Sequence, residues 1–168
     1  RKLSEGNCAS VPKEKHSVSS VGMTKEDFKL SLVSSLCTLL LHNESRVMFS
    51  IGEGFYTIGP CGEETLSSIG VVAKNNDPMA LHYRHVAVQI ARQLKEGAAI
   101  EKILLERARG YCASSKDPVT GGVHCAIGGG SHDFVVSSTI ASQSGPAVGR
   151  ALGAKLSHSL GVKSSIQP

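Results

Sequence analysis

Glycines at four-residue spacing constrain the fold of this 168-residue chain more than any other feature. Gly145, Gly149 and Gly153 recur within the small-residue segment 144–156. Residues four apart lie on one side of an α-helix, and each glycine costs a helix about 1 kcal/mol relative to alanine. Close approach of another backbone is the simplest compensation for that cost. The spacing therefore predicts a helix that packs tightly against a second helix.

Helical patterns also dominate the earlier part of the chain. Thr24 and Asp27 predict a capped helix start, and apolar residues at helical spacing continue that helix to Asn43. Further helices are expected over residues 62–74, 86–95 and 98–107, with the last two forming a hairpin around Gly97.

Two segments favour extended structure. Residues 45–59 are dotted with glycines and lead into Pro60, which predicts short extended pieces and turns. Residues 134–136, Phe-Val-Val, predict a short strand before the glycine-spaced helix. The whole pattern predicts a helix-rich α/β domain over residues 23–168, preceded by a flexible leader over residues 1–22.

Composition excludes several classes of function. The net charge is +4, but the basic residues are spread along the chain and only 4% of residues are aromatic, so nucleic-acid binding is not expected. Five cysteines without a C-x-x-C pair argue for a reducing compartment. The longest apolar run is far shorter than the roughly 20 residues of a membrane span. We therefore expect an intracellular protein that does not enter a membrane.

The residues that could carry chemistry leave alternatives open. A glycine-rich loop over residues 110–130 could cradle a phosphate, but it matches neither nucleotide-binding signature. Tyr83 and Arg84 offer a phenol and a guanidinium at the start of a helix, which suits a diphosphate, although an arginine solvated at a helix end is the alternative. Several histidines and Cys125 could ligate zinc, but neither paired zinc knuckles nor an H-E-x-x-H motif occurs.

Three segments in a fixed order point to a known family. They are L-H-Y-R-H at 81–85, D-P-V-T-G-G-V-H at 117–124 and S-S-T-I-A-S-Q at 137–143. This ordered set resembles the alpha part of the decarboxylating component of 2-oxo acid dehydrogenase complexes, of the branched-chain type or the form with fused alpha and beta parts. The likeness extends over residues 46–156. It implies an incomplete thiamine-diphosphate-binding fold that is helix-rich with few parallel strands.

The resemblance also implies roles for individual residues. Tyr83 and Arg84 match the pair that contacts the cofactor diphosphate. Ser138 and Ile140 match residues that support the aminopyrimidine and the bent cofactor. His124 matches a histidine near the substrate, where it would act in catalysis or only pack the loop.

A structural monovalent cation, K+, is a further implication of the branched-chain likeness. The matching positions are Ser137, Thr139, Ser142 and Gln143, whose oxygens suit a hard cation. Thr139 stands where that subfamily usually has proline, so the cation is an open question.

For the whole assembly, the resemblance implies oxidative decarboxylation of a 2-oxo acid and acyl transfer to a lipoyl group. The cofactors would be thiamine diphosphate and Mg2+, and the partners a beta part and a lipoyl-bearing acyltransferase, in an oligomer of the cytoplasm or the mitochondrial matrix. The family's Gly-Asp-Gly motif and a later Asn hold the magnesium, and nothing after Gly161 supplies them. We therefore expect a chain truncated before the metal-binding motif and inactive in isolation.

Two other functions compete with this interpretation. One is a noncatalytic alpha-like interaction module that has lost cofactor binding but keeps the glycine-spaced helix. The other is a thiamine enzyme of the transketolase type, which predicts more basic and histidine residues around the pocket than the sequence offers.

Overall fold

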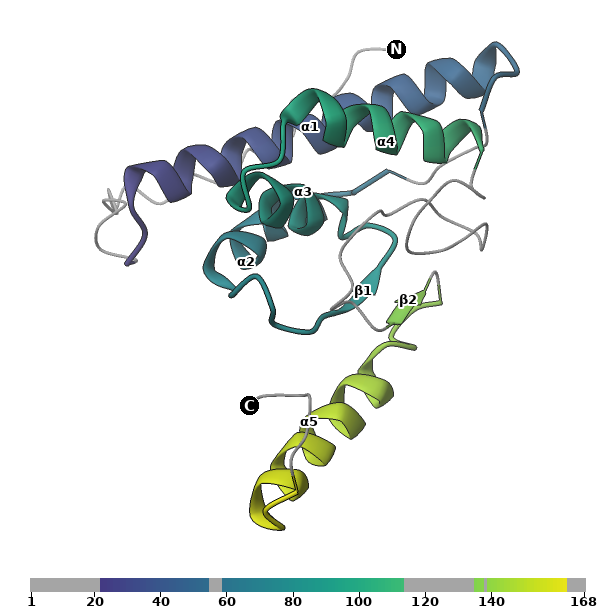
Figure 1. Cartoon of the computed structure of the whole chain (residues 1–168). Coiled ribbons are helices and arrows are strands. Elements are labelled where there is room, and N and C mark those ends of the chain that lie inside the picture. The colour runs from purple at the N-terminus through teal and green to yellow at the C-terminus, as the bar shows by residue number, and fades with distance from the viewer. Residues whose placement is uncertain (1–21, 55–58, 114–134, 138, 163–168) are drawn as a thin grey trace, which may run out of the picture.

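The computed structural model describes residues 22–54, 59–113, 135–137 and 139–162. The expected leader lies outside the described residues except for Gly22. The elements in chain order are α1 (Lys25–Ser50), the 3-10 turn η2 (Glu63–Leu66), α2 (Ser67–Val72), β1 (Ala80–His82), α3 (Val86–Lys95), α4 (Ile100–Cys112), β2 (Val135–Ser137) and α5 (Ser144–Ser159). The described part is helix-rich, as predicted (Figure 1).

Helix α1 begins at the predicted cap. The Thr24 hydroxyl accepts a hydrogen bond from the Asp27 backbone N–H at 3.0 Å, and the Asp27 carboxylate accepts one from the Thr24 N–H at 3.0 Å. This reciprocal pair satisfies donors that would otherwise be orphaned in the first turn. The same bonds lower the pKa of the Asp27 carboxyl.

The predicted end of α1 at Asn43 was wrong, because the helix continues to Ser50. Residues 44–50 contain no glycine or proline and can therefore extend the helix. The chain turns only at Gly52, whose φ of +79° favours glycine. The expected extended pieces therefore do not occur over residues 45–50, and residues 55–58 lie outside the described part.

The main core lies where α1, α3 and α4 meet (Figure 1). Ile90 and Ile103 are fully buried there, and Leu41 and Tyr111 pack against them. The predicted helix over residues 86–95 is confirmed, and α4 runs further than expected, to Cys112. A turn at Gly97 joins the two helices, but both also pack on α1.

Helix α2 packs against α1 on one side and closely against α3 on the other. Gly70 is buried, and a Cβ added there would overlap the carbonyl oxygen of Val88 on α3. On the other side, the Ser67 hydroxyl lies 2.8 Å from Ser31 Oγ and 2.9 Å from Ser35 Oγ of α1. Small residues thus let three helices approach one another.

The two strands pair in parallel, with Ala80 opposite Val135 and His82 opposite Ser137. The predicted strand over residues 134–136 is confirmed with a shift of one residue. Leu81 of β1 is buried and packs with Val88, which anchors this strand to α3. The strand pair therefore has a fixed position beside the helical core.

Apolar side chains also occupy the outer sides of α1 and α5. On α1 they alternate with a buried face of small polar residues that includes Ser34, Thr38 and Ser45. The exposed large apolar residues on α1 are Phe28, Leu32, Leu36, Leu39, Leu40, Val47 and Phe49. The helical periodicity of these residues predicted the helix, but it did not place them in the core.

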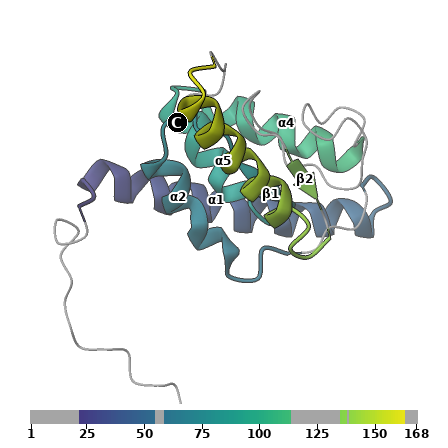
Figure 2. The same cartoon turned by 90° about the horizontal axis from the view of Figure 1, so that it is seen from below.

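Helix α5 extends away from the helical core beyond the two strands (Figures 1 and 2). Its outer side carries Val148, Leu152 and Leu156, which are at least half exposed, next to the three glycines. Nothing lies within 4 Å of a Cβ built at Gly145, Gly149 or Gly153. The described residues of this chain therefore do not provide the helix that the glycine stripe predicts.

No helix in the described ranges is both long enough and apolar enough to cross a membrane.

Candidate functional site

The parallel strand pair brings two distant sequence segments to one edge. In parallel strands the carboxyl ends lie at the same edge, and that edge is where α/β sheets commonly bind ligands. His82 ends β1 and pairs with Ser137, which ends β2. Tyr83 and Arg84 follow the first strand directly, and residues 138–143 follow the second. Two of the three segments on which the family resemblance depends therefore start side by side.

His82, Tyr83 and Arg84 form a stack at the end of β1. The His82 and Tyr83 ring centroids lie 4.0 Å apart. The Arg84 guanidinium carbon lies 4.8 Å from the centre of the Tyr83 ring, which is a cation–π contact. Each ring thus restricts the side chain next to it, so Arg84 is held against an aromatic surface.

Glu63 joins this stack from the neighbouring turn η2. One carboxylate oxygen lies 3.4 Å from Nη1 of Arg84, and the other lies 3.4 Å from Nε2 of His85. The opposite nitrogen of His85, Nδ1, accepts a hydrogen bond from the His82 backbone N–H at 2.9 Å. Five residues, from η2, the end of β1 and the turn that follows it, are therefore linked in a closed ring of contacts.

The ring fixes the protonation of His85. Because Nδ1 is an acceptor, the neutral imidazole carries its proton on Nε2, which faces Glu63. Burial lowers the pKa of His85, and Glu63 opposes this shift only in part. His85 is therefore a neutral donor to Glu63 near neutral pH.

Two side-chain nitrogen atoms of the stack lack a hydrogen-bond partner among the described residues. They are Nε2 of His82 and Nε of Arg84, and both atoms are buried. The His82 side chain belongs to a residue that is only 4% exposed. Buried polar groups are nearly always hydrogen-bonded in folded proteins, so these two nitrogen atoms mark a place where a further group, water or ligand, would complete the stack. An oxyanion is the kind of group that would satisfy them.

The turn after β2 contains three of the four predicted cation ligands. Ser142 donates from its N–H and from its hydroxyl to the Thr139 carbonyl, at 3.2 and 2.9 Å. Gln143 has a buried side-chain oxygen without a partner in the described part of the chain. A buried acceptor suits a cation, so Gln143 is compatible with the predicted site. The Ile140 side chain is 85% exposed.

The other predicted residues cannot be placed. Ser138 and His124 lie outside the described residues, as does most of the expected loop over residues 110–130. The backbone of Ser137 is described, but its side chain is not. Among the described residues, no group of three His, Cys, Asp or Glu side chains could hold a metal ion.

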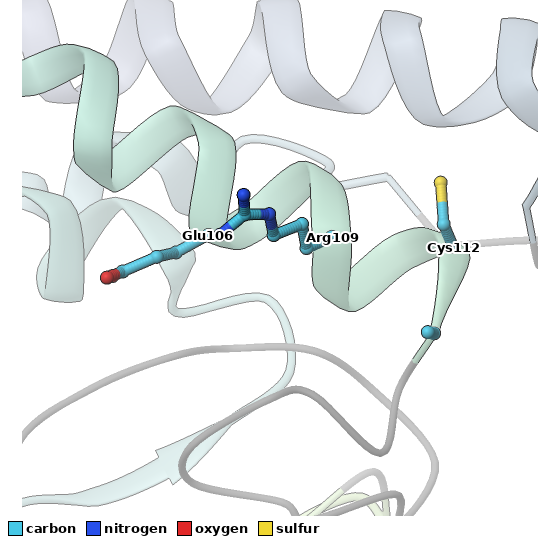
Figure 3. Close-up of a pocket in the computed structure, with 4 residues that line it drawn as sticks. Glu106, Arg109 and Cys112 are labelled. Atoms are coloured by element: carbon cyan, nitrogen blue, oxygen red, sulfur yellow. The ribbon is translucent and has the colours of Figure 1, made fainter.

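A cavity of about 510 Å³ lies elsewhere, at the end of α4. Glu106, Arg109, Cys112 and Ala113 line it, and none of them belongs to the predicted site (Figure 3). The Cys112 sulfur points away from Arg109 toward α1, where it lies 3.4 Å from the Met48 sulfur. This cavity therefore adds nothing to the edge formed by β1 and β2.

Comparison with known proteins identifies no relative: no family model, curated protein or solved structure matches this chain.

Sequence reasoning missed the contributions of Glu63, His82 and His85. In the sequence, Glu63 is only an acidic residue at the start of the helix expected over residues 62–74, and His82 and His85 are among the histidines that could ligate zinc. Their density around Tyr83 and Arg84 was the available signal, because titratable groups gathered at one strand end commonly mark a functional site. The contact with Glu63 spans about twenty residues of sequence and could not be read from spacing.

Proposed function

We propose that this chain forms the amino-terminal part of the decarboxylating component of a 2-oxo acid dehydrogenase, and that the edge formed by β1 and β2 helps to bind thiamine diphosphate. The observation that supports this most is the pairing of His82 with Ser137. Because of this pairing, Tyr83 and Arg84 follow β1 at the same edge where residues 138–143 follow β2. The resemblance assigns residues of that second segment to the rest of the cofactor.

The described residues fit the diphosphate part of this cofactor. Arg84 presents a buried Nε donor, and a guanidinium suits phosphate oxygens through its several fixed N–H groups. The start of α3, at Val86, adds the partial positive charge of a helix amino terminus close to Arg84. Together these groups offer both charge and directed hydrogen bonds to an anion.

When bound, thiamine diphosphate supplies the electron sink that lets a 2-oxo acid lose carbon dioxide. The share of this chain is to bind and orient. Arg84 and Tyr83 would hold the diphosphate, while Ser138 and Ile140 would support the rings. His124 would orient the substrate, and Gln143 with Ser137, Thr139 and Ser142 would hold a monovalent cation. The Gly-Asp-Gly motif and the later Asn that the resemblance assigns to magnesium do not occur in the given sequence after Gly161.

The sequence encoded beyond Pro168 tests the proposal without any assay of activity. We expect a strand that leads into Gly-Asp-Gly, with an Asn about one helix later. A reading frame that continues without these residues would contradict the proposed enzyme function. The noncatalytic interaction module would then be the remaining candidate.

The interaction module is the second candidate because of α5. Val148, Leu152 and Leu156 are exposed beside the three glycines, so a partner could cover a continuous apolar side. A module of this kind predicts association without binding of thiamine diphosphate. Measuring both properties on the complete protein separates the two candidates.

A further inference from the structure

His82 has features that the proposed function does not use. Its side chain is buried, its ring stacks on Tyr83 at 4.0 Å, and its Nε2 atom lacks a partner among the described residues. Leaving a buried donor or acceptor unsatisfied costs free energy, because the group has lost its hydrogen bonds to water. A group that completes His82 would recover that free energy, which makes this position favourable for a ligand.

Arg84 shows from which side such a ligand would approach. The guanidinium uses Nη1 for Glu63, whereas its buried Nε has no partner in the described part. An oxyanion therefore has an unused donor on the Nε side, and the Glu63 carboxylate repels it from the Nη1 side. Tyr83 contacts both His82 and Arg84, so the two unpartnered nitrogen atoms belong to neighbouring side chains of one cluster.

We propose that His82 is an anion-binding residue that acts through Nε2 together with Nε of Arg84 on a phosphate or diphosphate group. The inference rests on the proposed function only for the source of that group, a bound cofactor. The burial of His82 Nε2 and Arg84 Nε, and their lack of a partner among the described residues, do not depend on the proposed function.

The contacts of His85 and Glu63 keep this arrangement in place. His85 accepts from the backbone N–H of His82, which fixes the end of β1. Glu63 then links His85 to Arg84, at 3.4 Å on each side. Glu63 and His85 are thus positioning residues, while His82 and Arg84 contact the anion directly.

The test is an NMR titration of the full 168-residue chain with inorganic pyrophosphate, observed at the histidine ring nitrogens and at Arg84 Nε. We expect saturable shifts at His82 Nε2 and Arg84 Nε, with His158 on the exposed side of α5 as the internal reference. Shifts confined to Arg84, or no saturable shift at either atom, would overturn the role of His82.

Thiamine diphosphate and thiamine without phosphate form the other arms. The inference predicts that thiamine alone leaves His82 unshifted and that both diphosphates shift it. If the complete protein binds thiamine diphosphate no more tightly than pyrophosphate, the proposed function fails while the anion site stands. If it binds the cofactor tightly with His82 unaffected, only the inference fails.

Variants provide a second measurement. His82→Phe keeps a ring to stack on Tyr83 but removes Nε2, so we expect pyrophosphate affinity to fall at least about tenfold, as for a lost hydrogen bond to a charged group. His158→Phe makes the same exchange away from the site and should leave the affinity unchanged. Equal affinity of the two variants would overturn the proposal, and the wild-type titration decides if His82→Phe does not fold.

Discussion

Gly70 is the position where one added carbon atom should most disturb the fold. A Cβ at this site would overlap the Val88 carbonyl oxygen and lie 3.0 Å from the Ala91 Cβ on α3. Both neighbours belong to a helix that packs in the core, so neither can move as the end of a flexible side chain could. Helices α2 and α3 would have to separate to accept Gly70→Ala.

The magnitude follows from two opposing effects. Alanine should gain about 1 kcal/mol over glycine from helix propensity. Overpacking typically costs about 1 to 3 kcal/mol, and the upper end applies because the clash is with backbone. We expect a net loss of about 2 kcal/mol in the free energy of unfolding, which lowers the melting temperature by about 4 to 8 °C in a chain of this size.

Gly149→Ala is the matched control, because it makes the same change in a helix where nothing lies within 4 Å of the new atom. It should gain up to about 1 kcal/mol in the isolated chain. Urea unfolding followed by far-ultraviolet circular dichroism compares the two variants with the wild type. A Gly70→Ala variant as stable as the wild type, or more stable, would refute the close approach of α2 and α3.

Three further predictions concern the ring of contacts, α5 and the isolated chain. Because burial holds the pKa of His85 below the value of 6.5 of an unperturbed histidine, the unfolded chain binds more protons. Stability should therefore be complete above about pH 6.5 and fall as the pH drops, and urea unfolding of His85→Asn across this range should show a weaker dependence. Gly149→Leu should weaken association of the complete assembly while preserving secondary structure, and an unaltered oligomer in sedimentation would show that the stripe is not an interface. Calorimetry on the isolated chain should detect no micromolar, magnesium-dependent binding of thiamine diphosphate, because Arg84 is present without a metal clamp.

Local chemistry explains which elements could be predicted from the sequence. The cap at Thr24 and Asp27 marks a helix start through hydrogen bonds within four residues. Both of these bonds, one in each direction between the two residues, form as expected. Helix α3 matches its expected bounds because its apolar pattern is uninterrupted up to the turn at Gly97. Phe-Val-Val predicted β2 because β-branched residues favour strands.

Contacts between distant segments explain the rest. The serine cluster of Ser31, Ser35 and Ser67 lets polar side chains occupy part of the inner face of α1, and most of its leucines, unlike Leu41, lie outside. Periodicity identifies a helix but not which of its faces is buried. The link from Glu63 to Arg84 depends in the same way on how η2 packs beside α3.

We propose above that Arg84, at the edge formed by β1 and β2, binds the diphosphate of thiamine diphosphate. The decisive experiment is calorimetric titration of the cofactor with magnesium into the complete protein, as wild type and as Arg84→Ala. We predict tight binding to the wild type, weakened by about 1.5 to 3 kcal/mol in the variant, as for a lost hydrogen bond to a charged group. Equal affinities, or no binding by the complete wild-type protein, would contradict the claim.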